Sequence, residues 1–208
     1  MVDKIKSPRE KYEASFAEYT HAAGARAFAH GRHALAVLLK ALGVVEGDRI
    51  GVCGYTCVSV LEAVKVSGAV PVYLDVDKYL CIDPDAVRRQ GHGQIKVVIL
   101  QHTFGVPGQL EELLRACSDI GAEVIEDCAH SLGCFWNGKP LGTFGSGAIY
   151  SSEWGKPYTT GQGGVLTVNS LQLLEKVDAV IRSLSSPPLL WNQLILAFER
   201  FIYPILGK

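Results

Sequence analysis

Short apolar runs alternate along the chain with segments whose apolar side chains recur at helical spacing. Continuous apolar runs bounded by turn residues predict buried strands, and an i, i+3, i+4 period predicts helices. The predicted strands are residues 49–54, 70–74, 95–100, 124–127, 147–150 and 165–168, preceded by an extended piece at 26–29. The predicted helices are residues 8–20, 34–42, 58–67 and 107–120. This alternation is typical of a mostly parallel sheet with helices on both faces.

Local signals indicate where some of these helices begin and end. Leucines recur at helical spacing between residues 35 and 42, and Gly43 follows as a stop. Asp83 and Pro84 form a typical helix start, with Asp83 as the N-cap and Pro84 at the first helical position.

Composition limits the class of protein. The chain has 208 residues, 48% hydrophobic and 20% charged, which suits one soluble α/β domain, or one such domain with an appendage. A net charge of −1 and the lack of a basic run argue against nucleic-acid binding. The six cysteines are scattered and form no CxxC pair, and no apolar signal peptide opens the sequence. We therefore expect reduced thiols in a cytoplasmic protein, with neither disulfides nor a zinc site.

The last part of the chain differs from the rest. The sequence SSPP at 185–188 breaks the pattern, and the strongly apolar residues 189–208 follow. Polar residues within this tail, such as Asn192 and Glu199, and the break at Pro204 argue against a membrane span. We expect an amphipathic helix for a partner surface, in preference to a membrane-surface contact. The predicted division is a domain at 1–184 and a tail at 185–208.

Candidate chemistry gathers after three predicted strands. Asp127 ends one apolar strand, and Ser151 and Lys156 follow the next. The Gly-rich turn at 161–164 then leads into the third strand. Ligands of open α/β sheets bind at the carboxyl ends of strands, so these side chains are site candidates. A carboxylate, a lysine and a serine in these places suit an aldehyde cofactor with a basic ring nitrogen and a phosphate.

Several segments together resemble one family. They are EDCAHSLG, NGKPLGTFG, YSSEWGKPYTTGQGG, GRHALAVLLKALGVVEGDRI, GYTCVSVLEAVKVSGAVPVYLDVD and QHTFGVP. Across residues 12–170 the chain resembles the pyridoxal-phosphate-dependent sugar aminotransferases of the DegT/DnrJ/EryC1/StrS group. The resemblance implies the large domain of a fold-type I enzyme, a three-layer α/β/α structure with a mixed, mostly parallel sheet. The resemblance also implies a smaller C-terminal domain, which we expect to be absent from this chain.

The resemblance assigns roles at the reacting end of the cofactor. Lys156 would form the Schiff base with pyridoxal 5'-phosphate, and burial beside Trp154 and Tyr158 would favour its neutral amine. The family's dehydratase branch lacks this lysine, so its presence favours transamination. Asp127 would hold the protonated pyridine nitrogen and keep the ring cationic. His130 occupies the place of a family His or Gln that packs near the ring, with a structural histidine as the alternative.

At the phosphate end the resemblance is less complete. Ser151 matches a serine that hydrogen-bonds the phosphate, and the helix start at Gly31 offers free N–H groups to it. Arg32 and His33 replace the small hydroxyl residues usual there, so either the arginine joins the phosphate or this corner differs. Cys57 stands where the family commonly has an aromatic residue stacked on the cofactor.

The resemblance implies amino transfer from an amino acid, expected to be glutamate, to a keto-sugar, expected to be nucleotide-linked, in a homodimer. One alternative is a homologue that binds the cofactor without turnover, and another is a fold-type I enzyme acting on an amino acid. His102 either faces the site or is a buried structural histidine. Glu153 receives no role, and the isolated pair His30 and His33 does not support a metal site.

Overall fold

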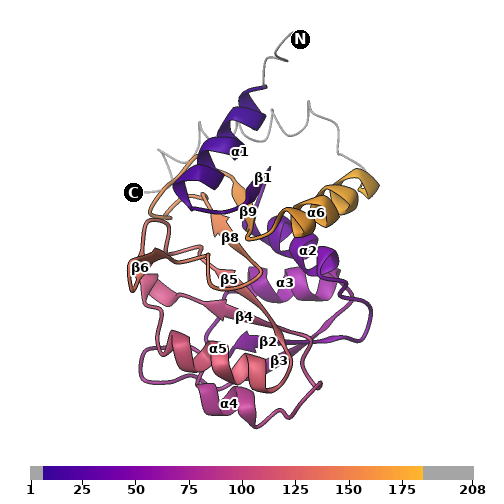
Figure 1. The fold of residues 1–208 in the computed structure, drawn as a ribbon, viewed down its shortest axis with the longest axis vertical. Helices are drawn as coiled ribbons and strands as arrows, with labels where there is room; N and C mark the ends of the chain where they lie inside the picture. The colour runs from indigo at the N-terminus through magenta and orange to yellow at the C-terminus, as the bar shows by residue number, and fades with distance from the viewer. Residues whose placement is uncertain (1–6, 185–208) are drawn as a thin grey trace.

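The computed structural model describes residues 7–184, and the tail predicted at 185–208 lies outside them (Figure 1). The helices are α1 (Pro8–Tyr19), α2 (Gly31–Ala41), α3 (Val58–Val66), α4 (Pro84–Arg88), α5 (Leu110–Asp119) and α6 (Leu171–Ser183), with a short 3₁₀ turn, η1 (Thr103–Gly105). The strands are β1 (Gly24–Phe28), β2 (Arg49–Cys53), β3 (Val70–Leu74), β4 (Val97–Gln101), β5 (Glu123–Asp127), β6 (Phe135–Trp136), β7 (Lys139–Pro140), β8 (Gly147–Ser151) and β9 (Gly164–Val168). Within the described part, no helix has the length and apolarity needed to cross a membrane.

One seven-stranded sheet forms the middle layer, in the order β1-β9-β8-β5-β4-β2-β3. The strands from β8 to β3 pair in parallel, whereas β9 pairs antiparallel with both β8 and β1. The register places Gln101 beside Asp127, and Asp127 beside Ile149. The carboxyl ends of β4, β5 and β8 therefore meet at one edge of the sheet, where the site candidates were predicted.

Helices cover both faces of the sheet, which confirms the predicted three-layer α/β/α fold (Figure 1). Val97 and Ile99 of β4 pack with α2, α3 and α6, whereas Val98 and Leu100 pack with α4 and α5. The period of two along a strand sends alternate side chains to opposite faces, so a continuous apolar run fills two cores at once. The core on the side of α4 and α5 also includes Phe16 of α1. Its ring lies edge-on to the Tyr150 ring, with the two centroids 5.2 Å apart.

The predicted elements are confirmed with shifted boundaries. α2 begins at Gly31, before the predicted residue 34, and α5 begins at Leu110, after the predicted residue 107. Gly108 has a left-handed φ of 61°, so the backbone before Leu110 is not helical. The structure adds α6, capped by Ser170, and the hairpin β6–β7.

Truncation of a core leucine tests the packing of α2 on the sheet. Leu38 is fully buried in the core formed with α3 and α6. We expect Leu38→Ala to lower the free energy of unfolding by about 2–5 kcal/mol, because the sheet cannot fill the cavity that remains. Leu171→Ala removes the same atoms from a side chain that is 67% exposed, and should change stability by less than about 0.5 kcal/mol. Urea unfolding measures both, and equal losses would contradict this packing.

Candidate active site

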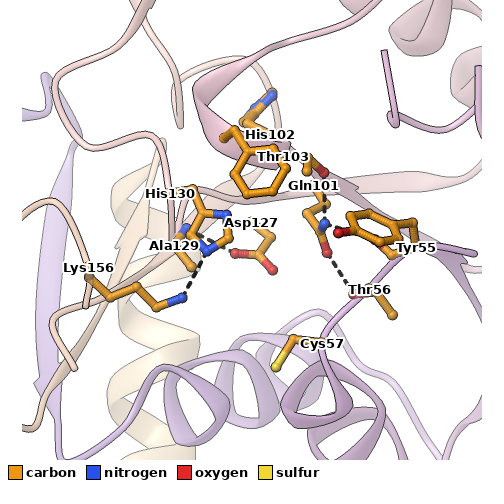
Figure 2. Close-up of a pocket in the computed structure, with 11 residues that line it drawn as sticks. Tyr55, Thr56, Cys57, Gln101, His102, Thr103, Asp127, Ala129, His130 and Lys156 are labelled. Atoms are coloured by element: carbon orange, nitrogen blue, oxygen red, sulfur yellow. Dashed lines mark hydrogen bonds between the residues drawn. The ribbon is translucent and has the colours of Figure 1, made fainter. Parts of the chain in front are cut away.

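Two adjoining cavities lie at the carboxyl edge of the sheet. The larger, about 330 Å³, is lined by Tyr55, Thr56, Cys57, Gln101, His102, Thr103, Phe104, Asp127, Ala129, His130 and Lys156. The smaller, about 80 Å³, is lined by Gly31, Arg32, Leu35, Cys57, Ser59, Val60, Asp127, Ala129, Ile149, Ser151, Glu153 and Lys156. Every predicted site residue therefore lines at least one cavity. Figure 2 shows the Lys156 amine and the Asp127 carboxylate pointing into the shared space, with Cys57 on its other side.

Asp127 is a buried carboxylate at the end of β5. Its side chain is nearly inaccessible, and Oδ1 accepts a hydrogen bond from the Ala129 N–H at 3.0 Å. Burial raises the pKa of Asp127, although the Ala129 N–H and the nearby Lys156, His102 and His130 lower it in part. An ionised carboxylate in such a place gains most from a cationic hydrogen-bond donor in the cavity. A protonated ring nitrogen is such a donor.

Lys156 reaches the cavity from the loop between β8 and β9. Its Nζ lies 3.0 Å from Nε2 of His130, in the loop after β5 (Figure 2). Burial lowers the pKa of His130, and the neighbouring lysine lowers it further. A neutral His130 therefore accepts a hydrogen bond from the amine. The predicted apolar surroundings of Lys156 are not what the structure shows, since Lys156 is only half-buried and Tyr158 is 42% exposed.

Phe104 covers His130 on the outer side. Its ring stacks on the imidazole, with centroids 5.6 Å apart and planes 4° from parallel. The Phe104 backbone is left-handed, with φ of 55° and ψ of 24°, although its side chain is 68% exposed. A non-glycine residue in this region carries strain, and such strain clusters at ligand sites. The motif QHTFGVP contained this residue, but no sequence signal marks the left-handed phenylalanine.

The smaller cavity is formed around the start of α2. The N–H groups of His33 and Ala34 both donate to the His30 carbonyl. Gly31 and Arg32 are the first residues of α2, where backbone N–H groups have no acceptor within the helix. β9 approaches this helix start so closely that a Cβ on Gly164 would lie 2.3 Å from the Gly31 nitrogen. Free N–H groups and the helix dipole together favour an anion here.

The two departures from the family pattern also lie at the cavities. The Arg32 guanidinium donates to the Glu62 carboxylate at 3.1 Å, so its predicted phosphate contact stays a prediction. Cys57 is the N-cap of α3 and is exposed, with its thiol on the wall shared by both cavities. The side chain at this position thus lines the cavities and offers sulfur in place of an aromatic ring, and its place beside a cofactor stays a prediction.

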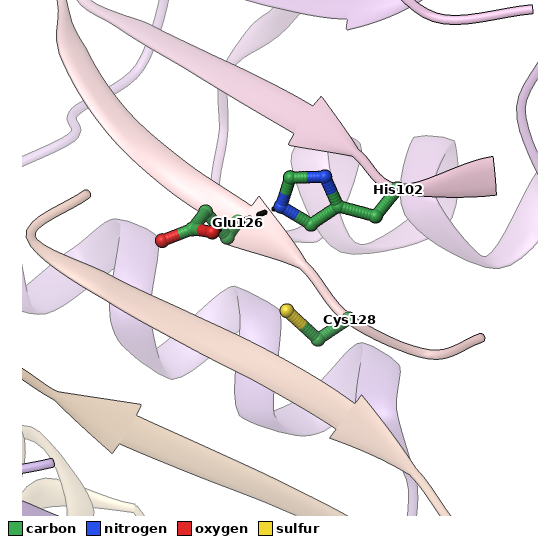
Figure 3. Close-up of side chains that lie close together, drawn as sticks. All are labelled: His102, Glu126 and Cys128. Carbon is green, nitrogen blue, oxygen red and sulfur yellow. Dashed lines mark hydrogen bonds and ion pairs between the residues drawn. The ribbon is translucent and has the colours of Figure 1, made fainter. Parts of the chain in front are cut away.

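Glu126 and His102 form a buried network behind the site (Figure 3). Glu126 accepts hydrogen bonds from His102 Nε2 at 2.8 Å and from the N–H groups of Gly142, Phe144 and Gly145 at 2.7–2.9 Å. His102 is therefore the buried structural histidine of the two alternatives, although it also lines the larger cavity. Together with Cys128 these side chains have the spacing of a metal site. All four hydrogen bonds would compete with a metal for the carboxylate oxygens.

Gln101 organises the far end of the larger cavity, and sequence reasoning gave it no role. Its Nε2 donates to the Tyr55 carbonyl at 3.0 Å and to Thr103 Oγ1 at 2.8 Å, and its Oε1 accepts from Thr56 Oγ1 at 2.6 Å (Figure 2). The amide thereby joins the loops after β2 and β4. Its position at the end of an apolar strand was the one available signal.

Comparison with known proteins agrees with this geometry. The model of the DegT/DnrJ/EryC1/StrS aminotransferase family matches residues 6–190. The chain belongs to this family. The GDP-perosamine synthase of Vibrio cholerae is 31% identical over 168 residues, which cover 80% of this chain and 46% of that protein. The L-glutamine:scyllo-inosose aminotransferase of Streptomyces griseus is 33% identical over 175 residues, which cover 82% of this chain and 41% of the relative.

Solved structures of aminotransferases share the fold. The aminotransferase from Psychrobacter cryohalolentis superimposes with a TM-score of 0.78 at 29% identity, over 86% of this chain and 49% of that chain. This chain thus spans about half of the length of the relatives that it matches.

Asp127→Asn tests whether the buried charge of Asp127 destabilises the cofactor-free chain. A raised pKa means that the folded chain holds this proton to a higher pH than the unfolded chain does. Stability of the cofactor-free chain should then fall as the pH rises from the ordinary aspartate range through the raised pKa. We expect Asp127→Asn to raise the Tm at neutral pH by about 2–4 °C, as roughly 1 kcal/mol does in a domain of this size. The gain in Tm should shrink as the pH falls to about 4, because Asp127 then binds its proton and loses its charge. A lower Tm of Asp127→Asn at neutral pH would contradict the argument.

Glu126→Ala tests the buried network. The change leaves His102 and three N–H donors without their acceptor, so we expect a loss of about 3–5 kcal/mol in the free energy of unfolding. Glu123→Ala is the matched control on the same strand, because this exposed carboxylate accepts one bond from Ser146 and should matter by less than about 1 kcal/mol. Chemical denaturation of both variants gives the comparison, and a similar loss in both would refute the role of Glu126.

Proposed function

We propose that this chain forms the cofactor-binding part of a pyridoxal-phosphate-dependent aminotransferase. The observation that carries the proposal is the convergence of Lys156, Asp127 and the start of α2 on two joined cavities. An amine, a buried carboxylate and a cluster of free N–H groups match the aldehyde, the ring nitrogen and the phosphate of this cofactor. Family membership supports the same conclusion.

The donor set fits the cofactor in kind and in place. One oxygen of Asp127 is used by the Ala129 N–H, and the carboxylate still faces the cavity. Ser151 lines the smaller cavity beside Gly31, where a hydroxyl and N–H groups suit a phosphate ester. The larger cavity, about 330 Å³, falls at the low end of the range of roughly 300–1,000 Å³ that small-molecule sites occupy.

Each side chain has a definite task in amino transfer. When bound, the cofactor supplies an electron sink for the substrate carbon. Lys156 would hold the cofactor through its aldehyde, and its free Nζ would carry a proton as general acid and base. Neutral His130 accepts a hydrogen bond from this amine and holds it at the cavity wall. Asp127 would accept a hydrogen bond from the protonated ring nitrogen and so favour the cationic ring.

The relatives indicate the class of substrate. One is named a GDP-perosamine synthase and another an L-glutamine:scyllo-inosose aminotransferase. We propose that the intact protein moves an amino group from an amino acid, glutamate or glutamine, to a keto-sugar or a similar cyclic ketone, expected to be nucleotide-linked. A homodimer in the cytoplasm is part of this proposal.

A second candidate is a homologue that binds the cofactor without turnover. Cys57 in place of an aromatic residue and the Arg32–Glu62 pair are the features that favour it. Addition of glutamate or glutamine to the loaded chain separates the two. A spectral change to the amine form of the cofactor supports the aminotransferase, and an unchanged spectrum supports binding alone.

Borohydride trapping tests the proposed attachment. We expect the chain to gain a visible absorbance band with pyridoxal phosphate, and reduction followed by peptide mass mapping should place the adduct on Lys156. Lys156→Arg keeps the charge but cannot attach the aldehyde, so it should lose the adduct. Lys139→Arg is the control, because this exposed lysine lies on β7 away from the lining of both cavities. An adduct that survives in Lys156→Arg would overturn the assignment.

A further inference from the structure

Glu153 and His30 join two parts of the site that are far apart in sequence. His30 Nδ1 and Glu153 Oε1 lie 2.9 Å apart. His30 is the N-cap of α2, and its side chain makes no capping hydrogen bond to the helix. Glu153 lies at the start of the turn that carries Lys156, and its carbonyl accepts the Lys156 N–H at 3.2 Å. The pair thus links the lysine turn directly to the helix start.

Backbone contacts beside the pair join the same two segments. His30 forms an isolated bridge with Gly163, and Glu153 forms one with Gly161. The neck of the loop is closed by the hydrogen bonds of Ser152 with Gly163 and Thr160. Beyond this neck most of the turn is exposed. The Lys156–His130 contact bears on the position of the lysine side chain, and the Glu153–His30 contact ties the base of the turn to the start of α2.

A small ligand that is held at both ends makes this link important. Pyridoxal phosphate carries its aldehyde and its short phosphate arm on neighbouring ring atoms, so the distance between the two groups is restricted to a narrow range. Lys156 must meet the aldehyde while the N–H groups of Gly31 and Arg32 meet the phosphate. We propose that the Glu153–His30 pair is a positioning element that sets the distance between Lys156 and the start of α2. This inference rests on the proposed function.

The charge of Glu153 acts in the opposite direction. Its carboxylate lines the smaller cavity, where it repels a phosphate. If repulsion outweighed positioning, removal of Glu153 would strengthen cofactor binding. Glutamine at this position keeps an acceptor and a donor for His30 but removes the charge. Comparison of Glu153→Ala with Glu153→Gln therefore separates the two effects.

Binding of two ligands to the full chain tests the proposal. Absorbance titration gives the affinity for pyridoxal phosphate and for pyridoxal, which lacks the phosphate and engages only the lysine end. We expect Glu153→Ala and His30→Ala to weaken pyridoxal phosphate binding about tenfold, because the phosphate then meets the start of α2 at a lower effective concentration once the aldehyde is held. The affinity for pyridoxal should change less than about twofold. Glu153→Gln should bind pyridoxal phosphate as the unmodified chain does. The double alanine variant should lose no more than either single variant, as expected for a coupled pair.

Glu175→Ala is the matched control, since Glu175 is an exposed carboxylate on α6 outside both cavity linings. Thermal melting without cofactor should show all variants folded, because a partly exposed pair contributes only about 0–1 kcal/mol. Unchanged or tighter binding of pyridoxal phosphate by Glu153→Ala overturns the proposal, and so does an equal loss for both ligands. If the unmodified chain forms no adduct on Lys156, the proposed function itself fails and the inference falls with it.

Discussion

The site depends on one buried carboxylate that does no chemistry. Glu126 has no exposed surface, and its carboxylate accepts hydrogen bonds from one histidine and from the backbone of one loop. A charge in this place is tolerated because four donors replace its water. The result is that the loop at 142–145, the end of β5 and the residue after β4 are held together. This arrangement also holds Asp127, the next residue along β5, because the backbone N–H of His102 donates to the Asp127 carbonyl.

Glu126 and Asp127 show how neighbours on a strand divide structure from function. Alternate side chains leave a strand on opposite faces, so Glu126 enters the protein while Asp127 faces the cavity. Glu126 is fully paired, whereas only one Asp127 oxygen has a hydrogen bond and burial raises its pKa. Asp127 can therefore still accept a hydrogen bond from a cationic donor. Functional sites commonly retain a group in such a costly state until a ligand arrives.

The fold was largely predictable from the sequence, because the parallel strands are largely apolar runs and most of the helices show a helical period. The exception is α6, which was not predicted from the sequence. That Asp127 and Lys156 would lie at the same edge of the sheet was predictable as well, because they follow the ends of two parallel strands. Their roles toward a cofactor stay predictions from the family resemblance. The partners of these residues were not predictable. The Lys156–His130 and Glu153–His30 contacts depend on how the loop at 152–163 folds back, which no local pattern specifies. His102 was ambiguous for the same reason, because its role depends on whether Glu126 lies within reach.

The Arg32–Glu62 ion pair raises the question of whether Arg32 is still able to bind a phosphate at the start of α2. Both side chains are partly exposed, so the pair contributes at most about 1 kcal/mol. A phosphate ester at the start of α2 would offer Arg32 a more highly charged partner with bidentate geometry, in a more enclosed place. We therefore expect Arg32 to exchange Glu62 for a phosphate bound at the start of α2. Arg32 would then supply a donor in place of the small hydroxyl residue usual there, so this departure from the pattern is compatible with the proposed phosphate site.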